Sequence, residues 1–250
     1  SRPDERKNIA ALIHAYGETP ELQKLANLVI VAGNRDDIDA MDKGSQVVLS
    51  GILKHIDKYD LYGHVAYPKH HESDDVADLY RLAAVSKGVF VNPAFTEPFG
   101  LTLIEAAASG VPIVATHDGG PRDIIGACKN GLLVDPLDSH DIASALLKVL
   151  SNELQWEKMS KSGLVGVHKY YSWESHVQKY VAAVENVIGK SRRVTDATSS
   201  KKNRLPTVDR LLVCDVDNTL LGDEKALQQL MDTIDSTNGK VGFAVATGRN

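Results

Sequence analysis

Residues 88–109 read GVFVNPAFTEPFGLTLIEAAAS, and they give the clearest fold signal in the chain. The run begins with apolar residues, as a strand buried on both faces does, and Asn92-Pro93 ends it because proline cannot donate to a strand ladder. Gly100 then opens a segment with helical periodicity, Leu101 to Ser109. A buried strand that passes through a loop into a helix predicts one βα unit of a parallel sheet.

The same alternation continues on both sides of this unit. Further apolar strands are predicted at 28–32, 64–67, 112–116, 132–134 and 210–214. Further helices are predicted at 9–16, 47–59, 76–86, 142–150, 153–171 and 173–188. This pattern indicates an α/β fold with a Rossmann-like parallel sheet covered on both faces. In such sheets ligands bind at the carboxyl ends of the strands, here at the loops 33–36, 68–71, 92–100 and 117–120.

A change in composition divides the chain. Residues 189–208 combine lysine and arginine with serine and threonine and lack an apolar period, as in a solvated basic linker. We therefore expect a first domain at 1–188 and the start of a second, incomplete domain at 209–250. The chain begins without methionine and stops just after a strand-like run, so we expect a fragment of a longer protein.

Composition limits the classes of partner. The 250 residues are 43% hydrophobic and 24% charged, and the formal net charge is −5, which fits a packed core and argues against nucleic-acid binding. The two cysteines, Cys128 and Cys214, lie far apart and form no metal-type spacing. The longest apolar runs have strand length, so no membrane span is expected. These features predict a cytoplasmic protein that binds neither membranes nor nucleic acids.

Two glutamates flank the predicted helix start. Glu97 precedes it and Glu105 lies in its second turn, on the order of 10 Å away at the helical rise. That distance is too long for a shared proton but suits contacts with two ends of one ligand. The helix N-terminus offers unpaired N–H groups to an anion, and Gly100 allows close approach. Alternatively, Glu105 is a surface residue and Glu97 a loop acid, because two glutamates at this spacing often occur by chance.

Two cations near the start of the chain, Arg2 and Lys7, provide a second signal. An arginine fork and a lysine point charge can stabilise a phosphate without proton transfer. The alternative is a pair of solvated cations, although the beginning of a helix is an unfavourable place for them. Arg6 is expected to be only a neighbour of this pair.

The segment from Glu97 to Glu105 resembles the E-x7-E motif of retaining glycosyltransferases with the GT-B fold, and Arg2 to Lys7 resembles their Arg-x4-Lys diphosphate clamp. The resemblance implies that Glu97 faces the donor sugar and Glu105 binds the ribose. It also implies that the backbone at Phe99, Gly100, Leu101 and Thr102 holds phosphate. No metal or other cofactor is then expected for glycosyl transfer.

Two further segments, 57–71 and 87–94, resemble the sucrose-phosphate synthase family. Membership would imply transfer of glucose from UDP-glucose to fructose 6-phosphate, with retention of anomeric configuration. The acceptor site would then lie mainly in an amino-terminal half of the GT-B fold that this chain lacks. In this fold His70 and His71 lie near the nucleotide base, and we favour a structural or donor-pocket role for them. Gly119-Gly120-Pro121 is interpreted chiefly as a turn into a helix.

The strand at 210–214 leads into Asp215 and Asp217, which fall on one side of the strand if it continues. Alternating carboxylates can hold Mg²⁺ and attack phosphorus, although a strand also commonly ends in a turn of this composition. The pattern resembles the first motif of haloacid-dehalogenase (HAD) phosphatases, and the segment before Arg249 resembles their second. This resemblance implies that Asp215 is the nucleophile, Asp217 the acid/base and Thr247 a phosphate ligand. It leaves open whether this domain is active.

Three other functions fit parts of the pattern. The chain could belong to another retaining glycosyltransferase, such as a relative of sucrose synthase. It could be a noncatalytic module that binds a nucleotide sugar. It could also belong to a sucrose-phosphate phosphatase whose upstream domain is noncatalytic.

Overall fold

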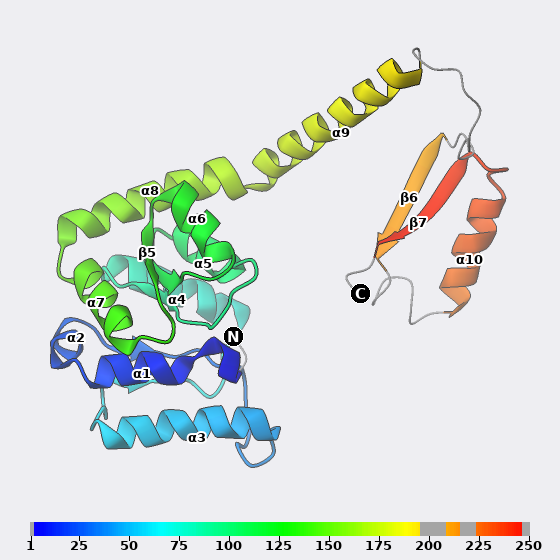
Figure 1. Ribbon diagram of the computed structural model, residues 1–250. Coiled ribbons are helices and arrows are strands. Elements are labelled where there is room, and N and C mark those ends of the chain that lie inside the picture. Colours follow the sequence, from blue (N-terminus) through cyan, green and yellow to red (C-terminus); the bar gives the residue numbers. More distant parts are fainter. Residues whose placement is uncertain (1–2, 196–208, 216–223, 247–250) are drawn as a thin grey trace. The chain divides into compact units, whose positions relative to one another are not determined.

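The structure is a computed structural model that describes residues 3–195, 209–215 and 224–246 (Figure 1). The chain divides into two compact units, 1–183 and 184–250. We describe each unit by itself.

All five strands of the first unit are parallel to their partners. β1 (Leu28–Val29) pairs with β2 (Val65–Ala66), and a three-stranded sheet has the order β3-β4-β5. These three strands span Phe90–Asn92, Ile113–Thr116 and Gly131–Val134. The predicted parallel α/β architecture is confirmed. The strands β1 and β2 are shorter than the runs predicted at 28–32 and 64–67, because they pair with each other over only two residues each.

The helices of the first unit alternate with these strands. They are the 3-10 helix η1 (Glu5–Lys7), α1 (Ile9–Gly17), α2 (Pro20–Leu25), α3 (Lys43–Lys58), α4 (Ser73–Val85), α5 (Leu101–Ala108), α6 (Gly120–Cys128), α7 (Ser139–Leu150) and α8 (Glu153–Tyr171). The helix α9 (Trp173–Thr195) begins in the first unit and continues past its boundary at residue 183. Several of these helices have side-chain caps. Asp42, Asp138 and Asn152, for example, accept hydrogen bonds from the first-turn amides of α3, α7 and α8. The short helix α2, which starts at a proline, was not predicted.

The central strand β4 separates two hydrophobic cores. Val114 points into a core that it shares with residues of α1, α3 and α7, whereas Ile113 and Ala115 point into a second core with residues of α5, α6 and α8. All three side chains are fully buried. The period-2 alternation of a strand thus places helices on both faces of the sheet. Packing on both faces of the sheet holds β3 and β4 in place, and it thereby positions the loops that follow the carboxyl ends of these strands.

The helix α9 runs through Thr195, so helix occupies the first residues of the segment predicted as a linker from 189. An apolar period continues from Trp173 through Val177, Val181 and Val184, and a single glycine within a helix costs only about 1 kcal/mol. The boundaries at 188 and 208 stay predictions.

The second unit contains a βαβ element. β6 (Arg210–Asp215) and β7 (Val241–Ala246) are parallel and pair along their whole length, and α10 (Glu224–Asp235) lies between them in sequence. Asp215 stands opposite Ala246 in this register. Across the described residues of both units, none of the helices combines the length and apolarity that a bilayer crossing requires.

Candidate functional site

Charged and polar side chains converge on Glu97, in the loop between β3 and α5. The Lys7 ammonium donates to Glu97 Oε2 at 3.0 Å, and the Asn92 amide donates to the same oxygen at 3.2 Å. The Glu97 side chain is only 13% exposed, whereas that of Lys7 is 38% exposed. Two residues predicted for one site, 90 positions apart in the sequence, therefore touch.

The ionised form of Glu97 is stabilised in place. Burial acts most strongly and by itself raises the pKa of this carboxyl, but the hydrogen bonds from Lys7, Asn92 and the Phe99 backbone, with the charge of Lys7, outweigh it and lower the pKa. Glu97 is therefore a carboxylate near neutral pH. Because its neighbours oppose protonation, it is suited to electrostatic and hydrogen-bonding roles rather than to proton donation.

Residues around Lys7 attach it to the loop that carries Glu97. Phe95 N donates to Arg6 O at 3.0 Å, and the Asn8 amide donates to Pro93 O at 3.0 Å and to Pro136 O at 2.7 Å. Asn8 is buried and adopts the left-handed conformation at φ 52°. Sequence reasoning missed this role of Asn8, although asparagine is among the few residues that tolerate that conformation.

The other cations near the chain start differ from Lys7. Arg6 binds Asp4 at 2.6 Å, and this hydrogen bond lowers the pKa of Asp4 to about 2. Its guanidinium thus has a local carboxylate partner, in keeping with the expectation that Arg6 is only a neighbour. Arg2 lies outside the described residues.

Two glycines bring a second loop against Glu97. Gly119 forms a β-bridge with Glu97, and Gly120 N donates to Glu97 O at 2.8 Å. A Cβ on Gly119 would lie 2.2 Å from Glu97 O, and one on Gly120 would lie 2.1 Å from Phe99 O. The turn predicted at Gly119-Gly120 therefore also packs the strap 117–120 directly on the Glu97 backbone. Two adjacent glycines after a buried strand are the signal for such an approach.

The predicted phosphate-binding segment opens α5. Gly100 is the N-cap at φ 96°, and no side chain caps the helix, so the first-turn N–H groups are not satisfied by a capping side chain. The side chains of Phe99 and Leu101 are exposed, and that of Thr102 is partly buried. This end of α5 presents backbone donors next to Glu97.

Glu105 lies on the exposed face of α5 and has a partner from α4. The Tyr80 hydroxyl lies 3.4 Å from Glu105 Oε2 and 3.3 Å from Thr102 O. Burial, then the Glu105 charge, raises the pKa of Tyr80, so the phenol stays protonated and can donate. Glu97 and Glu105 thus have separate partners. Sequence reasoning missed Tyr80, which lies in a helix with no local motif.

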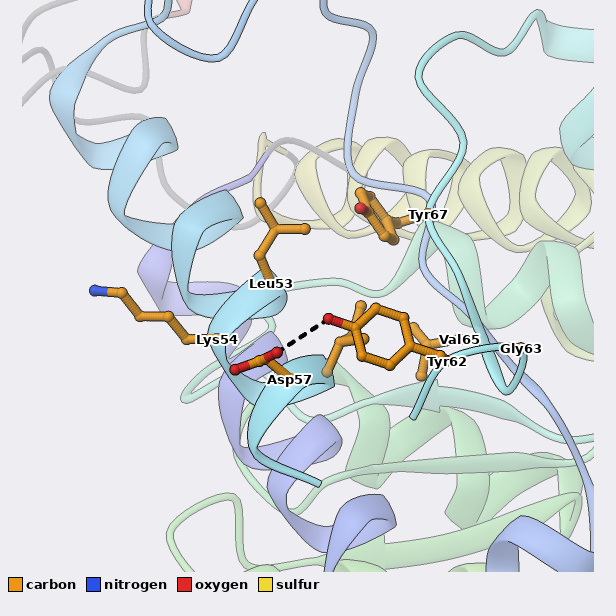
Figure 2. Close-up of a pocket in the computed structure, with 8 residues that line it drawn as sticks. Leu53, Lys54, Asp57, Tyr62, Gly63, Val65 and Tyr67 are labelled. Atoms are coloured by element: carbon orange, nitrogen blue, oxygen red, sulfur yellow. Dashed lines mark hydrogen bonds between the residues drawn. The ribbon is translucent and has the colours of Figure 1, made fainter. Parts of the chain in front are cut away.

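Two surface hollows lie elsewhere in the first unit. One of about 400 Å³ lies between α3 and β2, where Tyr62 donates to Asp57 and the Lys54 amine points away (Figure 2). The other, about 390 Å³, includes His70 and His71 beyond β2. The first contains none of the predicted site residues, and the second contains only the two histidines for which a structural or donor-pocket role was predicted. We place the candidate site at Glu97, because an open face on which charged groups converge can bind one side of a ligand without forming a pocket.

Metal-ligating side chains do not gather in the described part of the chain. There, no group of three or more histidine, cysteine, aspartate or glutamate residues could hold an ion. His70 lies 3.5 Å from Asp36. In the second unit, Asp215 ends β6, while Asp217 and Thr247 lie outside the described residues.

The comparisons with known proteins agree with this geometry. Residues 1–164 match the family described as glycosyl transferases group 1. The chain belongs to this glycosyltransferase family. Residues 208–250 match a second family, sucrose-6F-phosphate phosphohydrolase. The predicted architecture, the nucleotide-binding half of a glycosyltransferase followed by the beginning of a HAD-like domain, is confirmed.

Curated relatives of this glycosyltransferase chain include plant sucrose-phosphate synthases. It is 47% identical to sucrose-phosphate synthase 4 from Arabidopsis thaliana, over 98% of this chain and 24% of the relative. It is 58% identical to the sucrose-phosphate synthase from Spinacia oleracea, over 74% of this chain and 17% of the relative. The chain therefore spans about a quarter or less of the length of these relatives, and its resemblance to their family is confirmed.

Solved glycosyltransferase structures share the fold. A sucrose-phosphate synthase from Thermosynechococcus elongatus matches with a TM-score of 0.62 and 26% identity, over 76% of this chain and 44% of that one. The Anabaena protein HepE in complex with UDP-glucose matches with a TM-score of 0.61 and 19% identity, over 74% and 47%. The second likeness shows the fold alone.

Proposed function

We propose that this chain is the donor-binding half of a sucrose-phosphate synthase. The full protein transfers glucose from UDP-glucose to fructose 6-phosphate, with retention, and produces sucrose 6-phosphate. The convergence of Lys7 and Asn92 on the ionised Glu97 carries the proposal, since it builds a polar site at the carboxyl ends of parallel strands. The identity to plant sucrose-phosphate synthases supports the choice of substrates.

Each predicted residue has one role in this reaction. Lys7 and Arg2 stabilise the negative charge that develops on the leaving UDP, and the N-terminal amides of α5, from Phe99 to Thr102, bind its phosphates. Glu97 accepts hydrogen bonds from the glucosyl hydroxyls, and Glu105 accepts them from the ribose. These cations and amides supply the compensating charge, so the proposed transfer uses no metal.

The acceptor belongs to another part of the protein. Fructose 6-phosphate binds mainly to the amino-terminal half of the GT-B fold, which faces the donor half across a cleft. We assign the reaction to the cytoplasm, since Cys128 and Cys214 are both unpaired, as cysteines in a reducing compartment are.

One experiment tests the transferase activity. The full-length protein is incubated with UDP-glucose and either fructose 6-phosphate or fructose, and the products are identified by mass spectrometry. Sucrose 6-phosphate formed from fructose 6-phosphate supports the proposal. Sucrose formed only from free fructose would show a sucrose synthase instead, and binding of UDP-glucose without any transfer would show a noncatalytic module.

The second family match supports a phosphatase activity in the full protein. β6 brings Asp215 to its carboxyl end, opposite the residue of β7 that immediately precedes Thr247. The carboxylates Asp215 and Asp217 are the hard oxygen ligands that Mg²⁺ prefers, so the residues fit this ion. Asp215 would attack the phosphorus of sucrose 6-phosphate, Asp217 would protonate the leaving sugar oxygen, and Thr247 would bind phosphate. Bound Mg²⁺ would neutralise charge on the phosphoryl group.

The conservative substitution Asp215→Asn tests this second activity. We expect wild-type protein with UDP-glucose, fructose 6-phosphate and Mg²⁺ to release free sucrose, and the variant to stop at sucrose 6-phosphate. The rate of UDP release should stay the same in both. Accumulation of sucrose 6-phosphate by the wild type itself would show that the HAD-like domain is inactive.

A further inference from the structure

Asn92 uses both ends of its amide at the candidate site. It is the last residue of β3 and is only 7% exposed. Its Nδ2 donates to Glu97 Oε2 at 3.2 Å, while its Oδ1 accepts from Ala94 N at 3.2 Å. The two contacts fix the amide orientation, because a flipped amide would face a carboxylate with its oxygen and an N–H group with its NH₂. Asn92 therefore couples the end of a strand to the Glu97 carboxylate.

Asn92 and Lys7 donate to the same acceptor, but their side chains differ in how far they can move. Both donate to Oε2 of Glu97. The Lys7 ammonium sits on a long, partly exposed stem, whereas the short Asn92 side chain is buried between two fixed partners. A diphosphate is a stronger attraction for an ammonium than a single carboxylate, because it bears more charge. When such a group binds, Lys7 is the donor that can leave Glu97 and Asn92 the donor that stays.

We propose that Asn92 is a positioning residue that holds the Glu97 carboxylate toward the donor sugar while Lys7 turns to the diphosphate. This inference rests on the proposed function, because it assigns Lys7 and Glu97 to the diphosphate and sugar ends of a nucleotide sugar. It adds a change of partners to that site. The ion pair between Lys7 and Glu97 separates when the nucleotide sugar binds, and the Asn92 amide keeps the Glu97 carboxylate in place. Asn92 acts through Glu97 and does not touch the reacting atoms.

A purely structural role for Asn92 makes a different prediction. The contact with Ala94 N is a local turn bond, which could by itself explain the residue. Asn92→Asp separates the two roles, since aspartate has nearly the same size and keeps the acceptor for Ala94 N but loses the donor to Glu97. Asn92→Ala removes both contacts without adding a charge. Asn152→Asp is the matched control, because the exposed Asn152 uses only its acceptor, to cap α8.

The test uses the full-length protein. We measure kcat and KM for UDP-glucose, the inhibition constant of UDP and the melting temperature of each variant. A misplaced catalytic group costs on the order of 100-fold, so we expect Asn92→Asp and Asn92→Ala each to lower kcat about 10- to 100-fold. The UDP inhibition constant should change less than about 3-fold, because UDP lacks the sugar that Glu97 contacts. Asn152→Asp should match the wild type.

The pH dependence of kcat is a further measurement, and a purely structural role for Asn92 would leave it unchanged. Loss of a donor to Glu97 favours its protonated form, so the acid limb of kcat should move to higher pH in Asn92→Ala. The positioning role is overturned if kcat and this limb stay at wild-type values. It is also overturned if kcat and UDP affinity fall together with the melting temperature. A wild type that transfers no glucose would overturn the proposed function, and this inference with it. If Asn92→Asp does not fold, the kcat and pH profile of Asn92→Ala test the positioning role by themselves.

Discussion

At the scale of single residues, the Lys7–Glu97 pair links the site to the stability of the first unit. The folded pKa of Glu97 lies below its ordinary value of 4.5. The stabilisation that the pair contributes is therefore fully present above about pH 4.5 and is lost as the pH falls through the lower folded value. This contact also holds the start of the chain to the β3–α5 loop.

We predict that Lys7→Met lowers the free energy of unfolding by about 1 kcal/mol at pH 7, the upper range for a partly exposed ion pair. The difference should be smaller at pH 3, because the contribution of the ion pair is lost progressively as Glu97 takes up a proton below about pH 4.5. Urea unfolding followed by tryptophan fluorescence measures it, because both tryptophans, Trp156 and Trp173, lie in the first unit. Lys54→Met, at an exposed lysine of α3, is the control. An equal deficit at both pH values would contradict the prediction.

Asn8 allows conformational strain and hydrogen bonding to be measured separately. Asn8→Ala leaves two carbonyl acceptors without their donor and forces alanine into φ 52°, so we expect a loss of about 3 kcal/mol. Asn8→Gly loses the same hydrogen bonds without that strain and should cost about 1 kcal/mol less. Urea denaturation of the three proteins provides the comparison. Equal stability of the two variants would show that the backbone relaxes.

At the scale of elements, the strap 117–120 must approach the Glu97 loop more closely than any side chain allows. Gly119 has φ 88° and ψ −146°, a conformation essentially restricted to glycine, and the Cβ of an alanine would overlap Glu97 O. The site is therefore held from three directions: β3 through Asn92, the chain start through Lys7, and the strap before α6 through its backbone.

We predict that Gly119→Ala destabilises the first unit by about 3 kcal/mol or more and lowers UDP-glucose affinity in the same protein, because the strap must shift from the Glu97 backbone. Gly126→Ala in α6 is the matched control. Its Cβ would meet nothing within 4 Å, so it should stabilise by about 0.5–1 kcal/mol. Thermal melts and isothermal titration calorimetry measure the two effects. A tolerated Gly119→Ala would contradict the close approach.

At the scale of the whole molecule, the two units differ in how well they are packed. The first has two buried cores, one on each face of its sheet. In the second, none of the described side chains with an assigned exposure is buried. Since burial of apolar surface provides most of the folding free energy, the second unit should be the weaker one in this chain.

We predict that urea unfolding of the 250-residue chain is not two-state. Tryptophan fluorescence follows only the first unit, whereas far-UV circular dichroism follows both, so the dichroism transition should begin at lower urea. Superimposable transitions would show that the units unfold together. The domain boundary predicted at 188 can be tested in the same way, by repeating the measurement on residues 1–188.

Local signals in the sequence determined the elements and the chemistry of the site. Apolar runs and helical periods located the strands and most helices, because both depend on side-chain spacing along a few residues. Lys7 and Glu97, predicted for one site, are in contact, and Gly100 precedes α5 as expected, while their roles in binding a donor stay predictions. Arg2, Asp217 and Thr247 lie outside the described residues and stay predictions, as do the roles of Glu105 and Asp215.

Tertiary structure alone decided which of these groups meet. Lys7 and Glu97 are 90 residues apart, and no local pattern records that Asn8 and Phe95 bring them together. Nothing around Asn92 or Tyr80 in the sequence shows that each donates to a glutamate of the site. The end of α9 was also missed, because helical periodicity overrode a linker-like composition. The physical reason is common to these cases: periodicity reports contacts within an element, whereas a site forms where the loops of separate elements pack.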